Sequence, residues 1–157
     1  MTSSVNAVPA PSGVLPYLTV RGAPAAIEFY QRVFGAELCL RLDAPDGLMH
    51  AELTVGGARF MMTEEREQYG GTSPLKLGGS PVNLTIYVPN ADATVKAAEA
   101  AGATVDMPVA DQFWGDRMGS ITDPFGHKWM VATHIEDVSE AQLRERLAKM
   151  FAEGQQH

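Results

Sequence analysis

Val20-Arg-Gly-Ala-Pro-Ala-Ala-Ile27 returns further along the chain, much altered, as Val88-Pro-Asn-Ala-Asp-Ala-Thr-Val95. Downstream of these two segments, Gly57-Ala-Arg-Phe-Met-Met62 has its counterpart in Gly126-His-Lys-Trp-Met-Val131 at nearly the same spacing. Each copy reads as a strand, a helix and then several strands, so one supersecondary unit is used twice. Two such units can place their sheets around a shared cleft, and a cleft is where a ligand site is expected.

The composition excludes several classes of protein. The chain has 157 residues, of which 45% are hydrophobic, enough for one domain or for two small modules that share a core. Its net charge of −7 and its scattered basic residues argue against nucleic-acid binding, which depends on clustered Lys and Arg. No apolar run approaches the roughly 20 residues that span a bilayer, so we expect no membrane partner.

The cysteine content and the first residues favour a soluble cytoplasmic protein. Cys39 is the single cysteine, which rules out an internal disulfide and fits a reducing compartment. Because Cys39 lies in an apolar run, we expect it to be packed inertly in the core. Residues 1–13 are small, polar and Pro-containing, without the basic and apolar regions of a secretory signal, and predict a disordered lead-in.

Local signals place the elements of each copy. Pro24 suits the first turn of a helix and Gly35 its end, and Asn90 and Gly102 bracket the second helix in the same way. Alternating apolar residues predict strands near 15–20, 37–42, 47–55 and 58–63 in the first copy, and near 82–88, 103–109, 117–123 and 127–134 in the second.

A third helix closes the chain. Ser139 and Gln142 form a capping box, with Val138 and Leu143 as its hydrophobic staple. An apolar stripe follows, which we expect to pack on the domain itself or on a second subunit: Leu143, Leu147, Met150 and Phe151. The predicted organisation is a lead-in over 1–13, a single domain over 14–136, and a C-terminal amphipathic helix and tail over 137–157. The domain consists of modules 14–63 and 81–134, joined by the loop 64–80.

Strand alternation sorts the polar residues by face. In 48–55, His50 and Glu52 project to the same side, opposite Ala51 and Leu53. His50 and Glu52 either begin a metal site or form an ordinary polar pair on an open sheet, and spacing alone leaves both readings open. By the same alternation, Asn83 and Tyr87 share the mixed face of strand 82–88, and Tyr17 lies on that of strand 15–20.

The densest polar cluster is Asp111-Gln-Phe-Trp-Gly-Asp-Arg117. Trp114 is able to stack on a planar ligand and Arg117 to pair with a carboxylate, so this segment predicts a loop that lines a site. The alternative is that Trp114 caps the core while Asp116 and Arg117 form a local ion pair. Further on, Asp123-Pro-Phe-Gly-His127 is typical of a tight structural turn, on which we expect His127 to be exposed.

Several of these segments together resemble the vicinal oxygen chelate superfamily, the fold of glyoxalase I, bleomycin-resistance proteins and extradiol dioxygenases. They are Leu15-Pro-Tyr-Leu-Thr-Val20, Ile27-Glu-Phe-Tyr30, Phe34-Gly-Ala36 and Asp123-Pro-Phe-Gly-His-Lys-Trp129. Met49-His-Ala-Glu-Leu53 and the 111–117 segment are similar to its PhnB-like branch. The resemblance implies an α+β fold, in which two tandem βαβββ modules form an incomplete barrel around a cavity and a C-terminal helix follows. It also implies a homodimer.

Metal-dependent members of that superfamily carry one ligand on each of four strands. Those positions fall on Leu15, Glu52, Asn83 and Met130 here, and only Glu52 is a competent ligand for a hard divalent ion. We therefore expect no metal and no other cofactor, although His50 and His134 remain as candidates to replace a missing metal ligand.

Three functions follow from the resemblance and the polar residues. The first is binding of a small organic ligand, without a four-ligand metal site, in a cavity lined by Tyr17, Asn83, Tyr87, Gln112, Trp114 and Arg117. The second is a glyoxalase-type lyase or isomerase with Glu52 or His50 as general base, with or without a divalent metal. The third is a scaffold that retains a vestigial cavity.

Overall fold

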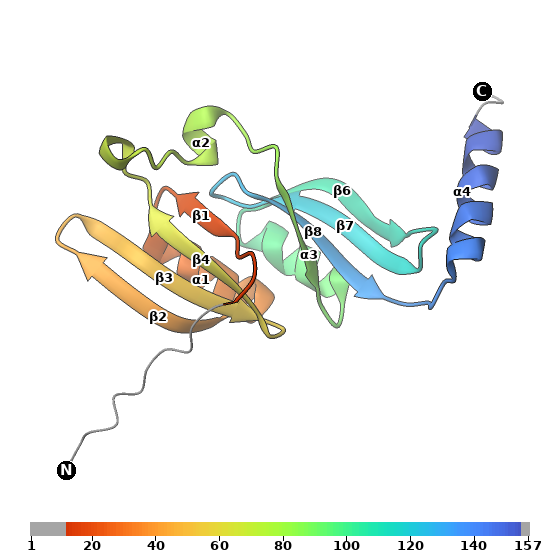
Figure 1. The fold of residues 1–157 in the computed structure, drawn as a ribbon, viewed down its shortest axis with the longest axis horizontal. Coiled ribbons are helices and arrows are strands. Elements are labelled where there is room, and N and C mark those ends of the chain that lie inside the picture. Colours follow the sequence, from red (N-terminus) through yellow and green to blue (C-terminus); the bar gives the residue numbers. More distant parts are fainter. Residues whose placement is uncertain (1–11, 155–157) are drawn as a thin grey trace, which may run out of the picture. The chain divides into compact units, whose positions relative to one another are not determined.

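The computed structural model describes residues 12–154, and it divides at Leu77/Gly78 into an N-terminal and a C-terminal unit. Each unit has a four-stranded mixed sheet with one helix packed against it (Figure 1). The lead-in predicted for residues 1–13 lies almost wholly outside the described residues, as does the end of the predicted C-terminal tail.

The N-terminal unit has the strand order β1-β4-β3-β2, in which β1 runs parallel to β4 and the other neighbours are antiparallel. Its elements are β1 (Tyr17–Val20), α1 (Ala23–Phe34), β2 (Glu37–Ala44), β3 (Gly47–Val55), β4 (Ala58–Glu64), the 3-10 turn Glu67–Tyr69 and the short helix α2 (Pro74–Leu77).

The C-terminal unit repeats this arrangement in the order β5-β8-β7-β6, again with one parallel pair, β5 and β8. Its elements are β5 (Asn83–Tyr87), α3 (Ala91–Ala100), β6 (Thr104–Asp111), β7 (Asp116–Thr122), β8 (Lys128–His134) and α4 (Glu140–Gly154). The predicted α+β architecture, two βαβββ modules followed by a C-terminal helix, is confirmed. Within residues 12–154 no helix has the length and apolarity to cross a membrane.

The core of the N-terminal unit lies between α1 and the sheet. Ile27, Tyr30 and Val33 of α1 are all buried. Tyr30 contacts Phe60 of β4 edge to face, with ring centroids 5.5 Å apart. Since alternate strand residues point to opposite faces, this packing commits the other face of the sheet to the remaining side chains.

The N-terminus of α1 is capped from β4. Gly22 stands at the cap position with φ of 90° and has no side chain to accept a hydrogen bond. The carboxylate of Glu64 fills that role: Oε1 accepts from Gly22 N at 2.8 Å and Oε2 from Ala23 N at 2.7 Å. A negative charge at this end of a helix is also favoured by the helix dipole.

Two irregularities in the β2–β3 pairing overturn sequence expectations. The register shifts between Leu38 and Leu40, which leaves Cys39 at a bulge of an edge strand, and Cys39 is exposed rather than packed in the core. A second shift pairs Leu42 with His50 and Asp43 with Leu48, so the alternation breaks at Met49. Leu48 is therefore buried and Met49 exposed, the reverse of what alternation predicts.

The connection after β4 is ordered by two charged side chains. Glu65 accepts hydrogen bonds from Ser73 N at 2.7 Å and from Arg21 at 2.9 Å, and these bonds lower its pKa to about 2. Arg66 is buried and donates to Asp46 at the β2–β3 turn, with a shortest distance of 2.7 Å. The predicted 64–80 loop is thus fastened to the sheet over its first part.

The turn between β7 and β8 is built around Asp123. Its Oδ1 accepts from Phe125 N and His127 N, each at 2.9 Å, and its Oδ2 accepts from Trp129 Nε1 at 2.9 Å. The structural role predicted for the turn is confirmed. His127, however, is buried rather than exposed, because the Asp123 carboxylate draws the turn inward.

The predicted capping box begins α4. Ser139 N donates to Gln142 Oε1 at 2.9 Å, and Gln142 N donates to Ser139 Oγ at 3.3 Å. Leu147, Met150 and Phe151 of the apolar stripe remain exposed. Packing on its own domain therefore does not cover the outer part of this stripe, and packing on a second subunit stays a prediction.

Replacing Glu64 by alanine tests the capping of α1. We expect Glu64→Ala to lower the free energy of unfolding by about 1–2 kcal/mol, as loss of a helix cap typically does. Asp43→Ala is the control, because it removes an exposed carboxylate paired with Arg41 on an edge strand, where little change is expected. Chemical denaturation of the three proteins measures the difference, and equal effects of the two substitutions would contradict the capping role.

Candidate functional site

Four polar side chains form a continuous chain on the open face of the N-terminal sheet, the face opposite α1. Tyr17 comes from β1, His50 and Glu52 from β3, and Arg59 from β4. Tyr17 pairs in register with Met61, which in turn pairs with Glu52, so the sheet aligns these three residues across neighbouring strands. We call Tyr17, His50, Glu52 and Arg59 the N-terminal polar chain.

Each member of this chain is hydrogen-bonded to the next. Tyr17 Oη lies 3.0 Å from His50 Nδ1, and His50 Nε2 lies 3.3 Å from Glu52 Oε1. Arg59 Nη1 donates to Glu52 Oε2 at 2.9 Å. Because a carboxylate only accepts, Nε2 carries the proton toward Glu52, which leaves Nδ1 of a neutral imidazole to accept from Tyr17. One tautomer of His50 thus satisfies both contacts.

Burial of its central carboxylate makes the N-terminal polar chain costly to desolvate. Glu52 is only 7% exposed, although it lies on the face without a helix. A buried carboxylate is costly unless it is paired and hydrogen-bonded, which Arg59 and His50 accomplish here. Tyr17, at the outer end, is 53% exposed. The chain therefore runs from a desolvated ion pair to an accessible aromatic ring.

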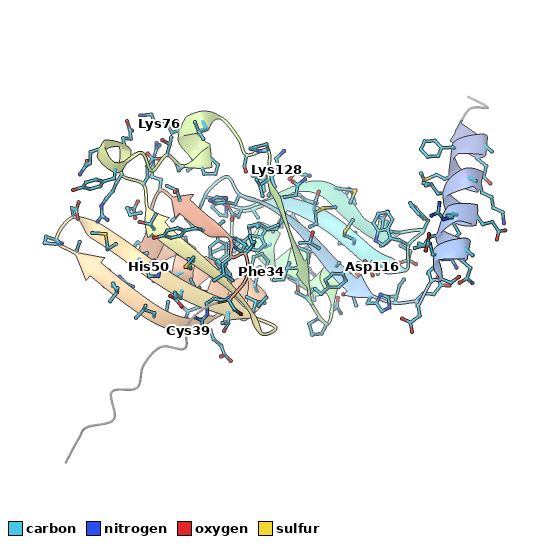
Figure 2. All side chains as sticks on the ribbon, viewed as in Figure 1. Phe34, Cys39, His50, Lys76, Asp116 and Lys128 are labelled. Atoms are coloured by element: carbon cyan, nitrogen blue, oxygen red, sulfur yellow. The ribbon has the colours of Figure 1, made fainter. Side chains whose placement is uncertain are left out.

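A second polar cluster surrounds Asp116 in the C-terminal unit. Asp116 Oδ2 accepts from Tyr87 Oη at 2.8 Å and from Trp114 Nε1 at 3.1 Å, and Oδ1 lies 2.9 Å from His134 Nδ1. Asp116 as a whole residue is 5% exposed, and Figure 2 labels it on the C-terminal sheet, with His50 on the N-terminal one. On its outer side, His134 Nε2 lies 2.8 Å from Asp137 Oδ1.

The contacts of this cluster shift three pKa values. Burial acts to raise the pKa of Asp116, but the hydrogen bonds from His134, Tyr87 and Trp114 outweigh it and lower that pKa. The bond to Asp116 raises the pKa of the Tyr87 hydroxyl. Asp137 and then Asp116 raise the pKa of His134 above its ordinary value of 6.5, which favours the imidazolium.

The predicted site residues fall into separate groups. Tyr17, His50 and Glu52 come together in the N-terminal unit, and Tyr87 and Trp114 in the C-terminal unit. Asn83 shares the open face of β5 with Tyr87, and Gln112 lies in the β6–β7 turn, where its side chain donates to Ala110 O. The cleft expected between the two modules stays a prediction.

Arg117 lies on the opposite face of β7 from its neighbour Asp116. It donates to Asp92 of α3 at 2.6 Å and to Asp111 at 2.8 Å, and these bonds raise its pKa. The alternative of a local ion pair between Asp116 and Arg117 is therefore wrong. Arg117 pairs with Asp92 and Asp111, and Asp116 pairs with His134. Because successive strand residues alternate, Arg117 is also kept apart from Tyr87.

Sequence reasoning overlooked Arg59, Asp137 and the central position of Asp116. Alternation along 58–63 places Arg59 on the same face as Met61, and this pattern is the sequence signal that identifies Arg59 as a residue of the open face. The contact between Asp116 and His134 depends on the pairing of β7 with β8 in register, which the sequence does not reveal. Asp137 lies outside any strand, so no periodicity points to it.

The residues at the four superfamily ligand positions do not suit a hard divalent ion. Leu15 and Met130 offer no hard donor, Asn83 offers one neutral oxygen, and Glu52 is already paired with Arg59. Among residues 12–154 no three His, Cys, Asp or Glu side chains form a group that could hold a metal ion.

Comparison with known proteins places the chain among described families. The model of the Glyoxalase/Bleomycin resistance protein/Dioxygenase superfamily matches residues 13–131. An uncharacterized protein of Mycobacterium tuberculosis (strain ATCC 25618 / H37Rv) is 40% identical over 157 residues, which cover 98% of this chain and 89% of that protein.

Solved structures agree with the family match. TioX from Micromonospora sp. ML1 has a TM-score of 0.62 and 28% identity, and the match covers 80% of this chain and all of TioX. A PhnB protein from Bacillus cereus has a TM-score of 0.61 at 18% identity, over 78% of this chain and 99% of that one, and shares the fold.

The charge state of His134 provides a direct test of the Asp116 cluster. We expect its imidazole to titrate above 6.5 in the folded protein, and Asp137→Asn to lower that value. Because the folded pKa is raised, the stability that charged His134 contributes is complete below 6.5 and is lost as pH rises through the folded value. Proton NMR of the imidazole, with His134→Asn for assignment, measures the titration.

Asp106→Asn serves as the control for this titration, because Asp106 is exposed and bonded to Thr122 instead. A His134 that titrates at or below 6.5, or that responds equally to both Asp→Asn substitutions, would contradict the arrangement.

Proposed function

This chain belongs to the Glyoxalase/Bleomycin resistance protein/Dioxygenase superfamily, and on that basis we propose that it binds a small organic ligand on the open face of its N-terminal sheet. The observation that carries the proposal is the N-terminal polar chain, in which Tyr17, His50, Glu52 and Arg59 are linked by hydrogen bonds.

The burial of Glu52 supports a binding role over a purely structural one. On a sheet face that is not packed against a helix of residues 12–154, a glutamate side chain is ordinarily solvated. Here the Glu52 side chain is desolvated and is held by Arg59 and His50. These hydrogen bonds fix the orientation of the polar groups in the N-terminal polar chain. Fixed polar groups beside apolar surface are typical of small-molecule sites.

The composition of the face suggests the kind of ligand. Met61 lies between Tyr17 and Glu52 in the register and supplies apolar surface. Tyr17 offers an exposed ring and a hydroxyl that already contacts His50. A ligand with a planar or apolar body and one hydrogen-bonding group matches this combination. Binding does not require a metal.

A second candidate function is proton abstraction of the glyoxalase type. His50 is held on both ring nitrogens, by Tyr17 and by Glu52, which is the arrangement of an oriented acid–base pair. Glu52 would accept a proton from a carbon acid bound on the sheet, which leaves a negative charge on the substrate. His50 would stabilise that negative charge by hydrogen bonding.

Tyr17→Phe tests the binding proposal. Ligands from a broad panel of small organic molecules that raise the melting temperature of the wild-type protein identify binders, since a ligand must stabilise the folded state. We expect Tyr17→Phe to weaken such a ligand about fivefold, the contribution of one hydrogen bond. Tyr69→Phe is the matched control, because Tyr69 is an exposed tyrosine outside the sheet.

Binding that is equally affected by the two substitutions, or a panel in which no molecule raises the melting temperature, would overturn the binding proposal.

Glu52→Gln separates the binder from the enzyme. For a ligand found by the panel, exchange of its acidic C–H with deuterium from solvent is followed by NMR. A catalytic Glu52 predicts exchange that falls by about 10²–10⁴-fold in Glu52→Gln, while the ligand still binds. A binding protein predicts no catalysed exchange in either form and a change in affinity only. Exchange that persists unchanged in Glu52→Gln would exclude Glu52 as the base.

A further inference from the structure

The end of β8 carries an imidazole with a carboxylate on each ring nitrogen. His134 Nδ1 lies 2.9 Å from Asp116 Oδ1, and His134 Nε2 lies 2.8 Å from Asp137 Oδ1. Because both partners accept hydrogen bonds and neither donates when ionised, both ring nitrogens carry protons. In this arrangement His134 is an imidazolium ion.

The two carboxylates hold His134 in very different ways. The Asp116 side chain is 7% exposed and is fixed by Tyr87 and Trp114 as well as by His134. Asp137 is fully exposed, and its ion pair with His134 lies at the surface, where such pairs contribute little. The inner contact therefore orients the ring, and the outer contact is readily exchanged.

An exposed aromatic ring lies beside this imidazolium. Tyr87 on β5 pairs with Ala132 on β8, yet its hydroxyl reaches Asp116 on β7. Its side chain therefore reaches across β8, on which Ala132 is fully buried. Tyr87 is 58% exposed and shares the partner Asp116 with His134. Apolar surface and a positively charged donor thus adjoin on one face of the C-terminal sheet.

We propose that His134 and Tyr87 form a binding site for a small aromatic carboxylate, whose carboxylate takes the place of Asp137 on His134 Nε2 and whose ring packs against Tyr87. This site lies in the C-terminal unit and shares no residue with the N-terminal polar chain, so it goes beyond the function proposed above.

The charges around His134 permit this exchange. The groups that face it are Asp116 from β7 and Asp137 from the segment before α4, with the Tyr87 hydroxyl from β5 bonded to Asp116. The neighbouring Glu136 is paired with Arg146 of α4 at 2.6 Å. Exchanging the Asp137 carboxylate for that of a ligand leaves the number of charges at the imidazolium unchanged. Binding needs the imidazolium and therefore weakens as pH rises through the titration of His134.

Benzoate is the probe, and benzamide is its uncharged control. Chemical-shift titration of the whole chain by NMR is expected to show saturable benzoate binding that moves the His134 ring signal, whereas benzamide at the same concentrations does not move that signal. At a pH low enough for His134 to be charged in both proteins, Asp137→Ala removes the internal competitor and is expected to tighten benzoate binding about two- to fivefold. Glu140→Ala, the matched control, removes an equally charged exposed residue that pairs with Arg144, and leaves affinity unchanged.

His134→Asn is the decisive variant. The Asn amide retains a donor near the position of Nδ1, so Asp116 keeps a partner, while the charge and Nε2 are lost. We expect it to weaken benzoate at least about tenfold, as loss of a charged hydrogen bond does. Unchanged affinity in His134→Asn, weaker or unchanged affinity in Asp137→Ala, or no saturable binding at tens of millimolar would overturn the proposal. Affinity is read at the NMR signals of His134 and its neighbours Tyr87 and Trp114, which keeps this outcome separate from any binding at the N-terminal site.

Discussion

Within residues 12–154, each sheet has one helix packed against it, and that helix covers one face. In the N-terminal unit, Tyr30 of α1 packs against Phe60, which commits alternate residues of every strand to the core. The other face must then accommodate Tyr17, Glu52 and Arg59, whatever their polarity. A register slip of one residue would exchange the two sets, so burial of the apolar set also positions the polar one. The candidate site therefore depends on the packing of α1.

Both open faces contain a nearly buried carboxylate, and the two are stabilised differently. Glu52 is paired with the guanidinium of Arg59 and hydrogen-bonded to His50. Asp116 has two neutral donors and an imidazolium whose charge depends on pH. The first arrangement holds both carboxylate oxygens of Glu52 by hydrogen bonds and suits a fixed binding surface. The second arrangement couples the buried carboxylate of Asp116 to the exposed His134, so it is the one that responds to pH.

Much of the fold could be predicted because its signals are local. Pro24, Gly35, Asn90 and the Ser139/Gln142 capping box mark helix ends through short-range geometry, and the structure has helices at all of them. The errors occurred where a longer-range effect intervened. Bulges in the β2–β3 pairing exposed Cys39 and reversed Leu48 and Met49. The Asp123 carboxylate drew His127 into the interior, although its turn looks like a surface turn in the sequence.

The sequence by itself determined the duplicated βαβββ pattern, the superfamily, and the common face of His50 and Glu52, since repeats and strand alternation are carried by neighbouring residues. Only the tertiary structure decided which partner each charge has. Glu52 receives Arg59 from the next strand, His134 meets Asp116 across the β7–β8 pairing, and Arg117 turns to Asp92 of α3. These contacts depend on the register between strands and on the placement of a helix, and both are set by burial of the whole sheet rather than by any local signal.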